Sequence, residues 1–468
     1  MQFPTTQFLQ FFAVFFVVYW ALPRHRWRMV WLLLASCVFY MSWNPWLILL
    51  ILFSASTDFV SALWMERTPS ARLKTGLLIG SISINLGLLG FFKYANFFLD
   101  TTAGLLWRIE VPFDRPTLDI ILPLGISFYT FETISYVVDV YRGRTRAVRD
   151  PLDYAIFIMF FPHLVAGPIV RPRDFLPQLR RAKWFDWDRA HLGVRMILVG
   201  FFKKCVIADH LGELVVDPIF KEPGTFASSA IWLGVLGYAI QIYGDFSGYS
   251  DMGIGLAHLL GFKLPQNFAY PYLAGNIADF WRRWHISLSS WLRDYLFIPL
   301  GGSRLGTWKT YRNLIVVMLL GGLWHGANWT FVIWGLYHGG LLALHRALPW
   351  PRFFGHALMR PVCVVTTFVA VCVGWVFLRA QSLAEAGLIL ERMAWPTAGT
   401  RLATGPALLA IGCVALTLVG HTLGTRIDFI RAERRLPAAA MGGALAGLLA
   451  LGLILFPEGS RAFIYFQF

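Results

Sequence analysis

The sequence is poor in charged residues, and in acidic residues above all. Charged side chains make up 14% of the 468 residues, with 26 Asp and Glu against 41 Lys and Arg. A soluble domain carries roughly 25% charged residues. Since 57% of the residues are hydrophobic, one water-soluble core could not enclose them all. The composition therefore predicts a polytopic membrane protein.

Cysteine is scarce, and several catalytic motifs are missing. No HExxH, GxSxG or P-loop sequence is present, so neither a metalloprotease nor a serine hydrolase is supported. The net charge of +15 comes without a nucleic-acid-binding module. We therefore expect no metal site and no nucleic-acid partner. The cysteines form no CxxC pair and are interpreted as small core hydrophobes: Cys37, Cys205, Cys363, Cys372 and Cys413.

Apolar runs of near-spanning length recur along the whole chain. We expect roughly eleven true crossings, with the remaining runs re-entrant or interfacial. The first run has no positive charge before it and no small-residue cleavage site after it, so it is expected to be a retained helix. The runs cover residues 7–22, 28–42, 45–64, 75–98, 118–140, 154–169, 191–207, 228–244, 312–324, 328–345, 361–378, 404–422 and 437–456.

The basic loops predict the orientation. Segments 23–28 and 65–74 are rich in Arg and Lys and flank a predicted helical hairpin, so both should face the cytoplasm and the N-terminus should face the other side. Segment 141–150 returns to the cytoplasm by the same rule. Segment 170–191 mixes basic and aromatic residues as an interfacial amphipathic piece does. The run at 154–169 between them should dip into the membrane and return.

Segment 279–295, DFWRRWHISLSSWLRDY, is predicted to form one helix. At 100° per residue its tryptophans share one stripe, Arg282 and Arg293 share a polar flank, and His285 lies at the border. The pattern favours an interfacial helix whose arginines meet lipid phosphates. The alternative is a polar flank that lines a cavity and binds an anionic donor such as a pyrophosphate.

His325 lies in the apolar, glycine-rich stretch LLGGLWHGANW. Burial disfavours the imidazolium, so a neutral ring able to accept a proton is expected, as a general base requires. The alternative is a packing histidine that hydrogen-bonds a carbonyl oxygen. His338 lies thirteen residues further on, and would be roughly 20 Å away on an unbroken helix. The two histidines are thus a poor metal pair.

Two further polar clusters are predicted at membrane depth. Segment 241–262 carries Asp245 and Asp251 among five glycines, and segment 121–141 carries Glu132 and Asp139. Intramembrane carboxylates are costly and are functional candidates by default. We expect Asp245 and Asp251 to line a tunnel or to satisfy a helix break, and Glu132 and Asp139 to be structural.

These stretches together resemble the membrane-bound O-acyltransferases, in particular the bacterial branch that includes the alginate O-acetyltransferase membrane subunit. The resemblance implies an all-α fold of tilted transmembrane helices around a central catalytic tunnel. It covers residues from about 10 to 390 in family order. The segments that carry it are LPLGISFYTFETISYVVDVYRG (122–143), FPHLVAGPIVRPRDFLPQL (161–179), GFFKKCVIADHL (200–211), QIYGDFSGYSDMGIGLAHLLGFKLPQNF (241–268), DFWRRWHISLSSWLRDYLFIPLGG (279–302), GLWHGANWTFVIWGLYHG (322–339) and VCVGWVFLRAQSLAEA (371–386).

The resemblance also assigns roles to residues. It implies that His325, in GLWHG, is catalytic and that His285, in RRWHIS, lines the cytoplasmic approach. We expect one integral-membrane domain over 1–468, with N-terminal helices in 1–100, core motifs in 120–345 and C-terminal helices in 355–468. The residues expected to line the donor tunnel are Arg282, Arg293, Asp294, Trp324, Asn328, Asp245 and Asp251.

The function implied is acyl transfer across a bacterial inner membrane. No bound cofactor is expected, and acetyl-CoA would be the donor substrate on the cytoplasmic side. The acceptor would be an exported polysaccharide, reached through a periplasmic partner protein. One rival is a transporter or flippase that uses the buried carboxylates and histidines as a proton relay, although no inverted repeat supports it. A non-catalytic scaffold is the other rival, and it would need no buried histidines.

Overall fold

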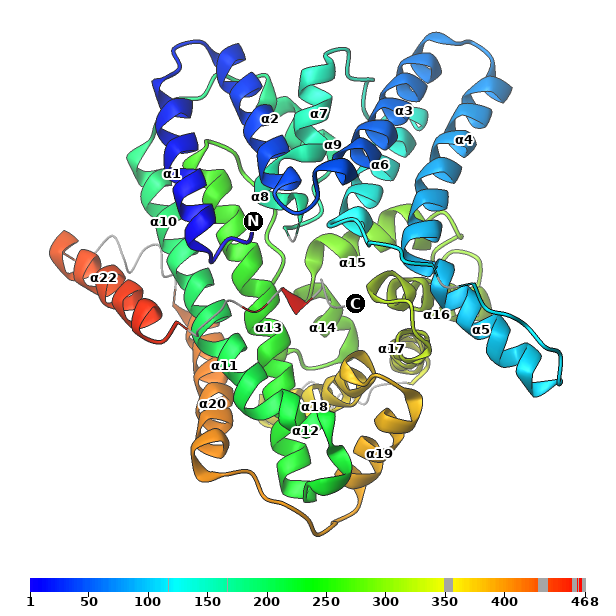
Figure 1. Ribbon diagram of the computed structural model, residues 1–468, viewed down its shortest axis with the longest axis vertical. Helices are drawn as coiled ribbons and strands as arrows, with labels where there is room; N and C mark the ends of the chain where they lie inside the picture. The colour runs from blue at the N-terminus through cyan, green and yellow to red at the C-terminus, as the bar shows by residue number, and fades with distance from the viewer. Residues whose placement is uncertain are drawn as a thin grey trace. The chain divides into compact units, whose positions relative to one another are not determined.

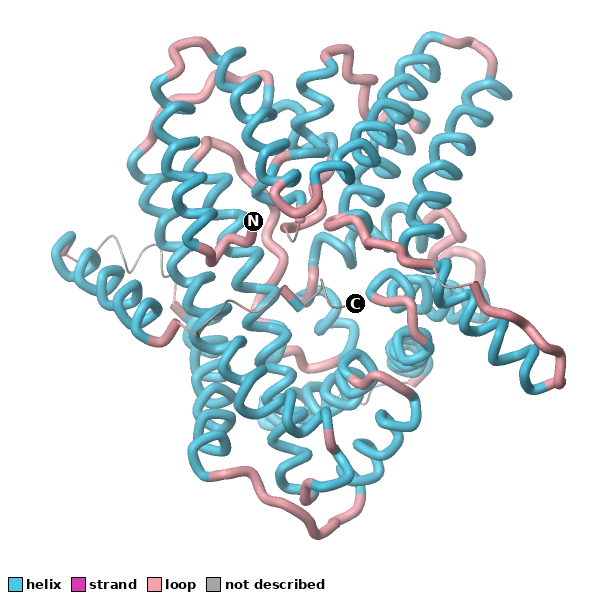
Figure 2. Tube along the Cα trace, in the orientation of Figure 1, coloured by secondary structure: helices cyan, strands magenta, loops and turns pink. Residues whose placement is uncertain are grey.

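The computed structural model describes residues 1–116, 118–165, 167–348, 357–427, 437–456, 461, 463 and 464. Figure 2 shows that helices make up nearly all of the regular structure. Within these ranges there is no β-strand, only an isolated bridge between Phe226 and Thr400. The chain divides into two compact units. The all-α prediction is confirmed.

The first unit comprises Met1–Val194 and Gly253–Pro265. Thr5, Ser70 and Asp150 cap three of its helices with side-chain oxygens. The helices of this unit are α1 (Thr6–Ala21), α2 (His25–Met41), α3 (Ile48–Arg67), α4 (Ala71–Leu89), α5 (Ala95–Arg108), α6 (Ile126–Tyr141), α7 (Pro151–Met159), α8 (Phe161–Leu164), α9 (Pro172–Leu179) and the first half of α10 (Trp187–Phe201) (Figure 1).

Asp58 is a fully buried carboxylate that joins three helices of the first unit. The amide of Asn85 on α4 donates to both of its oxygens, at 2.9 and 3.0 Å, and Ser81 donates to one of them. Thr133 on α6 donates to the Asn85 side-chain oxygen at 3.1 Å. A buried carboxylate is tolerated where neighbouring helices supply its hydrogen bonds. Asp58 therefore holds α3, α4 and α6 together.

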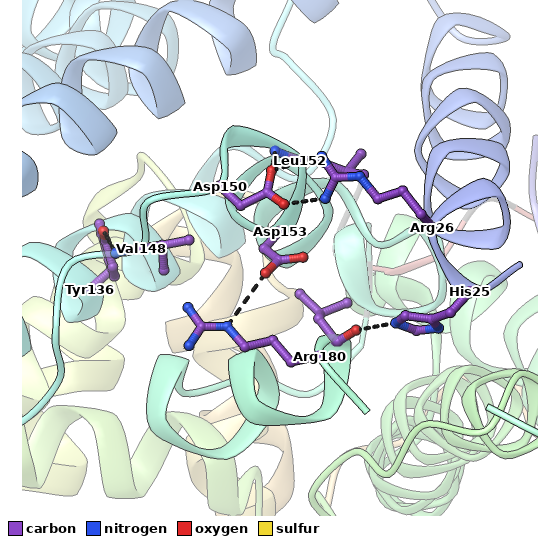
Figure 3. A network of polar contacts seen from close by, with 9 residues as sticks. His25, Arg26, Tyr136, Val148, Asp150, Leu152, Asp153 and Arg180 are labelled. Atoms are coloured by element: carbon purple, nitrogen blue, oxygen red, sulfur yellow. Dashed lines mark hydrogen bonds and ion pairs between the residues drawn. The ribbon is translucent and has the colours of Figure 1, made fainter. Parts of the chain in front are cut away.

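A second polar network ties the loops of the first unit together (Figure 3). Asp150 accepts a hydrogen bond from Leu152 N at 3.0 Å, which caps α7, and it also pairs with Arg26. Arg26 lowers the pKa of the Asp150 carboxyl by donating a hydrogen bond to it. Asp153 and Arg180 form a neighbouring pair at 3.6 Å. These contacts fix the N-terminus of α7 beside α2 and α9.

The run at 154–169 is not one helix. It is divided into α7 and the four-residue α8, with Phe160 in a non-helical conformation between them. Neither piece is long enough to span a bilayer of about 30 Å. The division agrees with a segment that does not cross as a single helix.

The second unit comprises Arg195–Met252 and Gln266–Phe468. Three π-helical segments, η3 (Phe202–Ala208), η4 (Gly212–Val216) and η7 (Arg293–Phe297), interrupt its α-helices. These helices are the second half of α10, α11 (Asp209–Leu211), α12 (Asp217–Lys221), most of α13 (Ser228–Leu259), α14 (Ile277–Arg283), α15 (Ile286–Leu292), α16 (Thr307–His325), α17 (Trp329–Ala347), α18 (Arg360–Arg379), α19 (Leu383–Ala394), α20 (Thr404–Arg426) and α22 (Ala438–Ile454).

Four helical segments among the described residues are long and apolar enough to cross a membrane. They are Pro45–Arg67, Ala71–Arg108, Arg360–Arg379 and Thr404–Arg426. Several other predicted runs form helices that are shorter or interrupted, as the run at 154–169 does. The membrane character of the chain is thus supported, while the expected total of roughly eleven crossings stays a prediction.

Candidate active site

The segment predicted as one helix over 279–295 is broken at His285. The helix α14 ends at Arg283, Trp284 is extended, and His285 adopts a left-handed conformation with φ of 42° before α15 begins. The amide of Ile286 donates to the main-chain oxygen of Asn267 at 2.9 Å rather than to a carbonyl of its own helix. The single-helix prediction was therefore wrong, because a partner distant in sequence takes one of its hydrogen bonds.

His285 is fully buried at this break. Its ring packs edge-on against Phe246 of α13, with centroids 4.6 Å apart, and lies 6.0 Å from the ring of Trp324. Its Nδ1 atom lies 3.3 Å from the side-chain oxygen of Asn267. Sequence reasoning did not single out Asn267. The signal available was its place at the end of the motif segment 241–268.

His325 is the last residue of α16, and the chain reverses directly after it. Gly326 is extended, and Asn328 begins α17 by accepting a hydrogen bond from Thr330 N at 3.0 Å. The Asn328 amide also donates to the carbonyl of Gln381 at 3.1 Å. The structure thus shows Asn328 as the cap that holds this reversal.

The reversal brings His338 back beside His325. Both rings contact the indole of Trp334, with centroid distances of 5.0 Å for His325 and 4.8 Å for His338. The separation of roughly 20 Å expected for an unbroken helix was wrong, since the helix ends at His325. Among the described residues, no three His, Cys, Asp or Glu side chains gather into a metal-binding group.

The three histidines form one cluster with two tryptophans. Trp324 lies between His285 and His325, at 6.0 and 5.0 Å, as Trp334 lies between His325 and His338. All five side chains are buried. We call this set, His285, Trp324, His325, Trp334 and His338, the histidine–tryptophan cluster. The cluster brings together the two histidines singled out by the family motifs, His285 and His325, which lie forty residues apart in the sequence.

The two predicted arginines differ in their surroundings. The Arg282 side chain is 70% exposed and pairs with Asp279 at 3.5 Å, as an interfacial arginine does. The Arg293 side chain pairs with Asp294 at 2.8 Å and lines a cavity of about 220 Å³. Trp281 forms another part of that cavity wall, and its ring lies 5.2 Å from the ring of His338. Arg293 therefore lies along a cavity beside the histidine–tryptophan cluster.

The predicted aspartates of α13 are both paired with lysines of η3. Lys204 contacts Asp245 at 2.5 Å and Asp209 at 2.7 Å, all three being buried. Lys203 contacts Asp251 at 2.6 Å. Since α13 runs without interruption past both aspartates, the helix-break alternative was wrong. Each of the two predicted aspartates therefore has a lysine partner, and Lys204 is shared between Asp245 and Asp209.

Asp245 also holds the last described residues of the chain. Its second oxygen accepts a hydrogen bond from Ile464 N at 2.7 Å. The neighbouring Phe463 packs on Phe246 and on Tyr249, with ring centroids 5.7 and 4.5 Å away. Phe246 thus contacts both the end of the chain and His285.

Comparison with known proteins identifies the family of the chain. Residues 144–349 match the family model described as MBOAT, membrane-bound O-acyltransferase family. The chain is 42% identical over 454 residues to the probable alginate O-acetylase AlgI of Pseudomonas putida. The aligned region covers 94% of this chain and 90% of the relative. The chain belongs to the membrane-bound O-acyltransferase family.

Two further relatives of this membrane-bound O-acyltransferase are similar over most of their length. It is 46% identical over 390 residues to the probable alginate O-acetylase AlgI of Azotobacter vinelandii, covering 82% of this chain and 76% of that one. It is 41% identical over 392 residues to the peptidoglycan O-acetyltransferase of Helicobacter pylori, covering 78% and 73%. The family resemblance predicted from the motifs is confirmed, and with it an enzyme of O-acyl transfer in a membrane.

The cluster suits the chemistry of a membrane-bound O-acyltransferase. Buried imidazoles can take and return a proton at a hydroxyl or thiol. The indoles around them keep the imidazoles away from water. The buried histidines are therefore candidates for proton transfer.

Proposed function

We propose that this O-acyltransferase takes an acetyl group from acetyl-CoA at the cytoplasmic face of a bacterial inner membrane, for O-acetylation of an exported polysaccharide. The observation that carries the proposal is the burial of His285 and His325 in one cluster, joined through Trp324. Relatives named for alginate and for peptidoglycan acetylation support an envelope polymer as the final acceptor.

His325 is proposed to act as the general base. As its imidazole takes the proton of the attacking hydroxyl, the oxygen forms a bond to the thioester carbonyl carbon. The C–S bond then breaks, and the imidazolium returns the proton to the leaving thiolate of CoA. The hydroxyl belongs either to the polysaccharide or to a serine of a periplasmic partner that completes the transfer.

Arg293 is proposed to support the donor side. The guanidinium borders the cavity beside Trp281, and arginine matches the phosphate groups of an anionic donor better than lysine does. The positive-inside rule applied to the basic loops supports a cytoplasmic donor and a periplasmic N-terminus. Asp294 would orient Arg293 through their contact at 2.8 Å.

The test is transfer of radiolabel from acetyl-CoA into envelope polymer by cells that carry wild type or His325→Ala. We expect label with wild type only, with equal membrane insertion of both proteins. His345→Ala is the matched control, since His345 lies on α17 outside the cluster, and it should keep wild-type labelling. Label retained by His325→Ala would refute the catalytic role. Polymer movement into vesicles without any acyl donor would favour the transporter instead.

A further inference from the structure

Asn267 is a buried side chain whose hydrogen bonds converge on His285. It lies in the irregular segment between α13 and α14 and is 1% exposed. Its side-chain oxygen accepts from the amide and the hydroxyl of Ser287, at 3.3 and 2.6 Å. The same oxygen lies 3.3 Å from His285 Nδ1. Its amide nitrogen donates to Ser250 Oγ on α13 at 3.2 Å.

This network determines which way the Asn267 amide points. A main-chain N–H can only donate, so the atom that faces Ser287 N must be the oxygen Oδ1 rather than the nitrogen. His285 Nδ1 faces that same oxygen, and an oxygen acceptor requires a proton on Nδ1. Neutral His285 is therefore the Nδ1–H tautomer, and its Nε2 carries a lone pair.

Asn267 also holds the backbone on which His285 stands. Its carbonyl oxygen accepts from Ile286 N at 2.9 Å, and the nearby Ala269 N donates to the carbonyl of Arg283 at 3.0 Å. These two bonds bracket His285, whose left-handed φ of 42° is costly for a residue with a Cβ atom. The segment around Asn267 thus compensates for the strain that orients the ring.

The free nitrogen of His285 is buried inside the cluster. Nε2 has no hydrogen-bond partner among the described residues, while the ring packs between Phe246 and Trp324. A buried ring nitrogen left without a partner costs about 1–3 kcal/mol. Since an unprotonated Nε2 can only accept, the group that satisfies it must be protic, such as a hydroxyl, thiol or amide N–H.

We propose that Asn267 is a positioning residue for the acyl transfer: it holds His285 as the Nδ1–H tautomer, so that Nε2 accepts the hydrogen bond of a protic substrate group beside Trp324. This inference rests on the proposed acetyl transfer. Asn267 does not touch the substrate. It acts through His285, as the orienting partner of a catalytic histidine does.

The test compares Asn267→Ala and Asn267→Asp with wild type in acetyl transfer. The Ala variant removes the acceptor that fixes the His285 imidazole. We therefore expect the maximal rate of transfer to fall by at least about tenfold, with a smaller change in KM for acetyl-CoA. The Asp variant keeps an oxygen acceptor and should retain more activity than Ala. Its carboxylate favours the imidazolium, so the acidic limb of its pH–rate profile should move to higher pH.

The pH readout depends on the groups around His285. Its ring neighbours on α13 and α16, Phe246 and Trp324, do not ionise. The residues next to them in sequence that do ionise are Asp245, paired with Lys204, and His325. On α14, Arg283 is paired with Asp279 at 3.0 Å. None of these residues is altered in the Asn267 variants. A shift of the pH–rate profile in Asn267→Asp therefore reports the carboxylate introduced at position 267.

Asn313→Ala is the matched control. Asn313 is another fully buried asparagine of the second unit. Its amide donates to Leu300 O and Gly302 O, at 3.1 and 3.0 Å, and its side-chain oxygen accepts from Arg312 rather than from a histidine. Its loss should lower stability without moving the pH profile. An equal fall in rate in Asn313→Ala, or an unchanged rate and profile in both Asn267 variants, would overturn the inference.

The transfer assay distinguishes a failure of the proposed function from a failure of the inference about Asn267. Absence of transfer by wild type would refute the function, whereas normal transfer by every Asn267 variant would refute the inference alone. If Asn267→Ala does not fold, the nearly isosteric Asp variant decides. Nitrogen-15 NMR of histidine-labelled protein reads the tautomer directly: a proton on Nε2 of His285 in the wild type would overturn the inference without any activity measurement.

Discussion

Adding one methyl group at Gly335 should separate α16 from α17 and disturb the histidine–tryptophan cluster. A Cβ atom at Gly335 would lie 2.5 Å from the carbonyl oxygen of Met318 and 2.8 Å from Leu319 Cα, both backbone atoms of α16. Ordinary contacts of this kind need about 3.5 Å, so the helices must move apart by roughly 0.5–1 Å. Trp334, which contacts His325 and His338, is the adjacent residue.

The magnitude follows from two opposing effects. Overpacking of this size costs about 1–3 kcal/mol, and replacing a helical glycine by alanine returns about 0.5–1 kcal/mol. We expect Gly335→Ala to lose about 1–2 kcal/mol of unfolding free energy. A displacement approaching 1 Å beside the reacting groups can reduce the rate by up to about 10²-fold, so transfer should fall further than stability alone explains.

Gly340→Ala is the internal control for this prediction. Gly340 lies on the same helix, and a Cβ atom there would meet nothing within 4 Å. That variant should be as stable as wild type or slightly more stable, with unchanged transfer. The assays are thermal unfolding in detergent and transfer of labelled acetyl. Equal behaviour of the Gly335 and Gly340 variants would refute the close helix approach.

Two further predictions concern charge pairs. Lys204→Met should destabilise the protein by about 3–5 kcal/mol, because it leaves the buried carboxylates of Asp245 and Asp209 unpaired. Lys203→Met should lower the unfolding free energy clearly less, since the side chains of Lys203 and Asp251 are 25% and 24% exposed. Equal losses of unfolding free energy for the two lysine variants in chemical denaturation would contradict this prediction. Arg26→Gln should cost at most about 1 kcal/mol at neutral pH, as exposed pairs do. Because Arg26 lowers the folded pKa of Asp150, this contribution is present above the ordinary Asp pKa of about 3.9 and is lost as the pH falls through the folded value. The gap in Tm between variant and wild type should therefore close in acid, and a constant gap would contradict the assignment.

The sequence by itself determined the class of the protein and its catalytic candidates. Composition and apolar runs indicate a membrane protein because both are properties of the linear chain. The motifs around His325 and His285 predicted the family, which the relatives confirm. The short helices on either side of Phe160 also agree with the prolines and glycine that the sequence places there.

Only the tertiary structure decided how the site is assembled. The break at His285 depends on Asn267, eighteen residues away, whose two oxygen atoms accept hydrogen bonds from the main-chain amides of Ile286 and Ser287. The lysine partner of Asp245 comes from η3, on a different segment of the chain. His338 joins His325 because the chain reverses at Asn328. Helical periodicity describes only neighbours within a few turns, so contacts made by chain reversal and by distant hydrogen bonds appear only once the helices are packed.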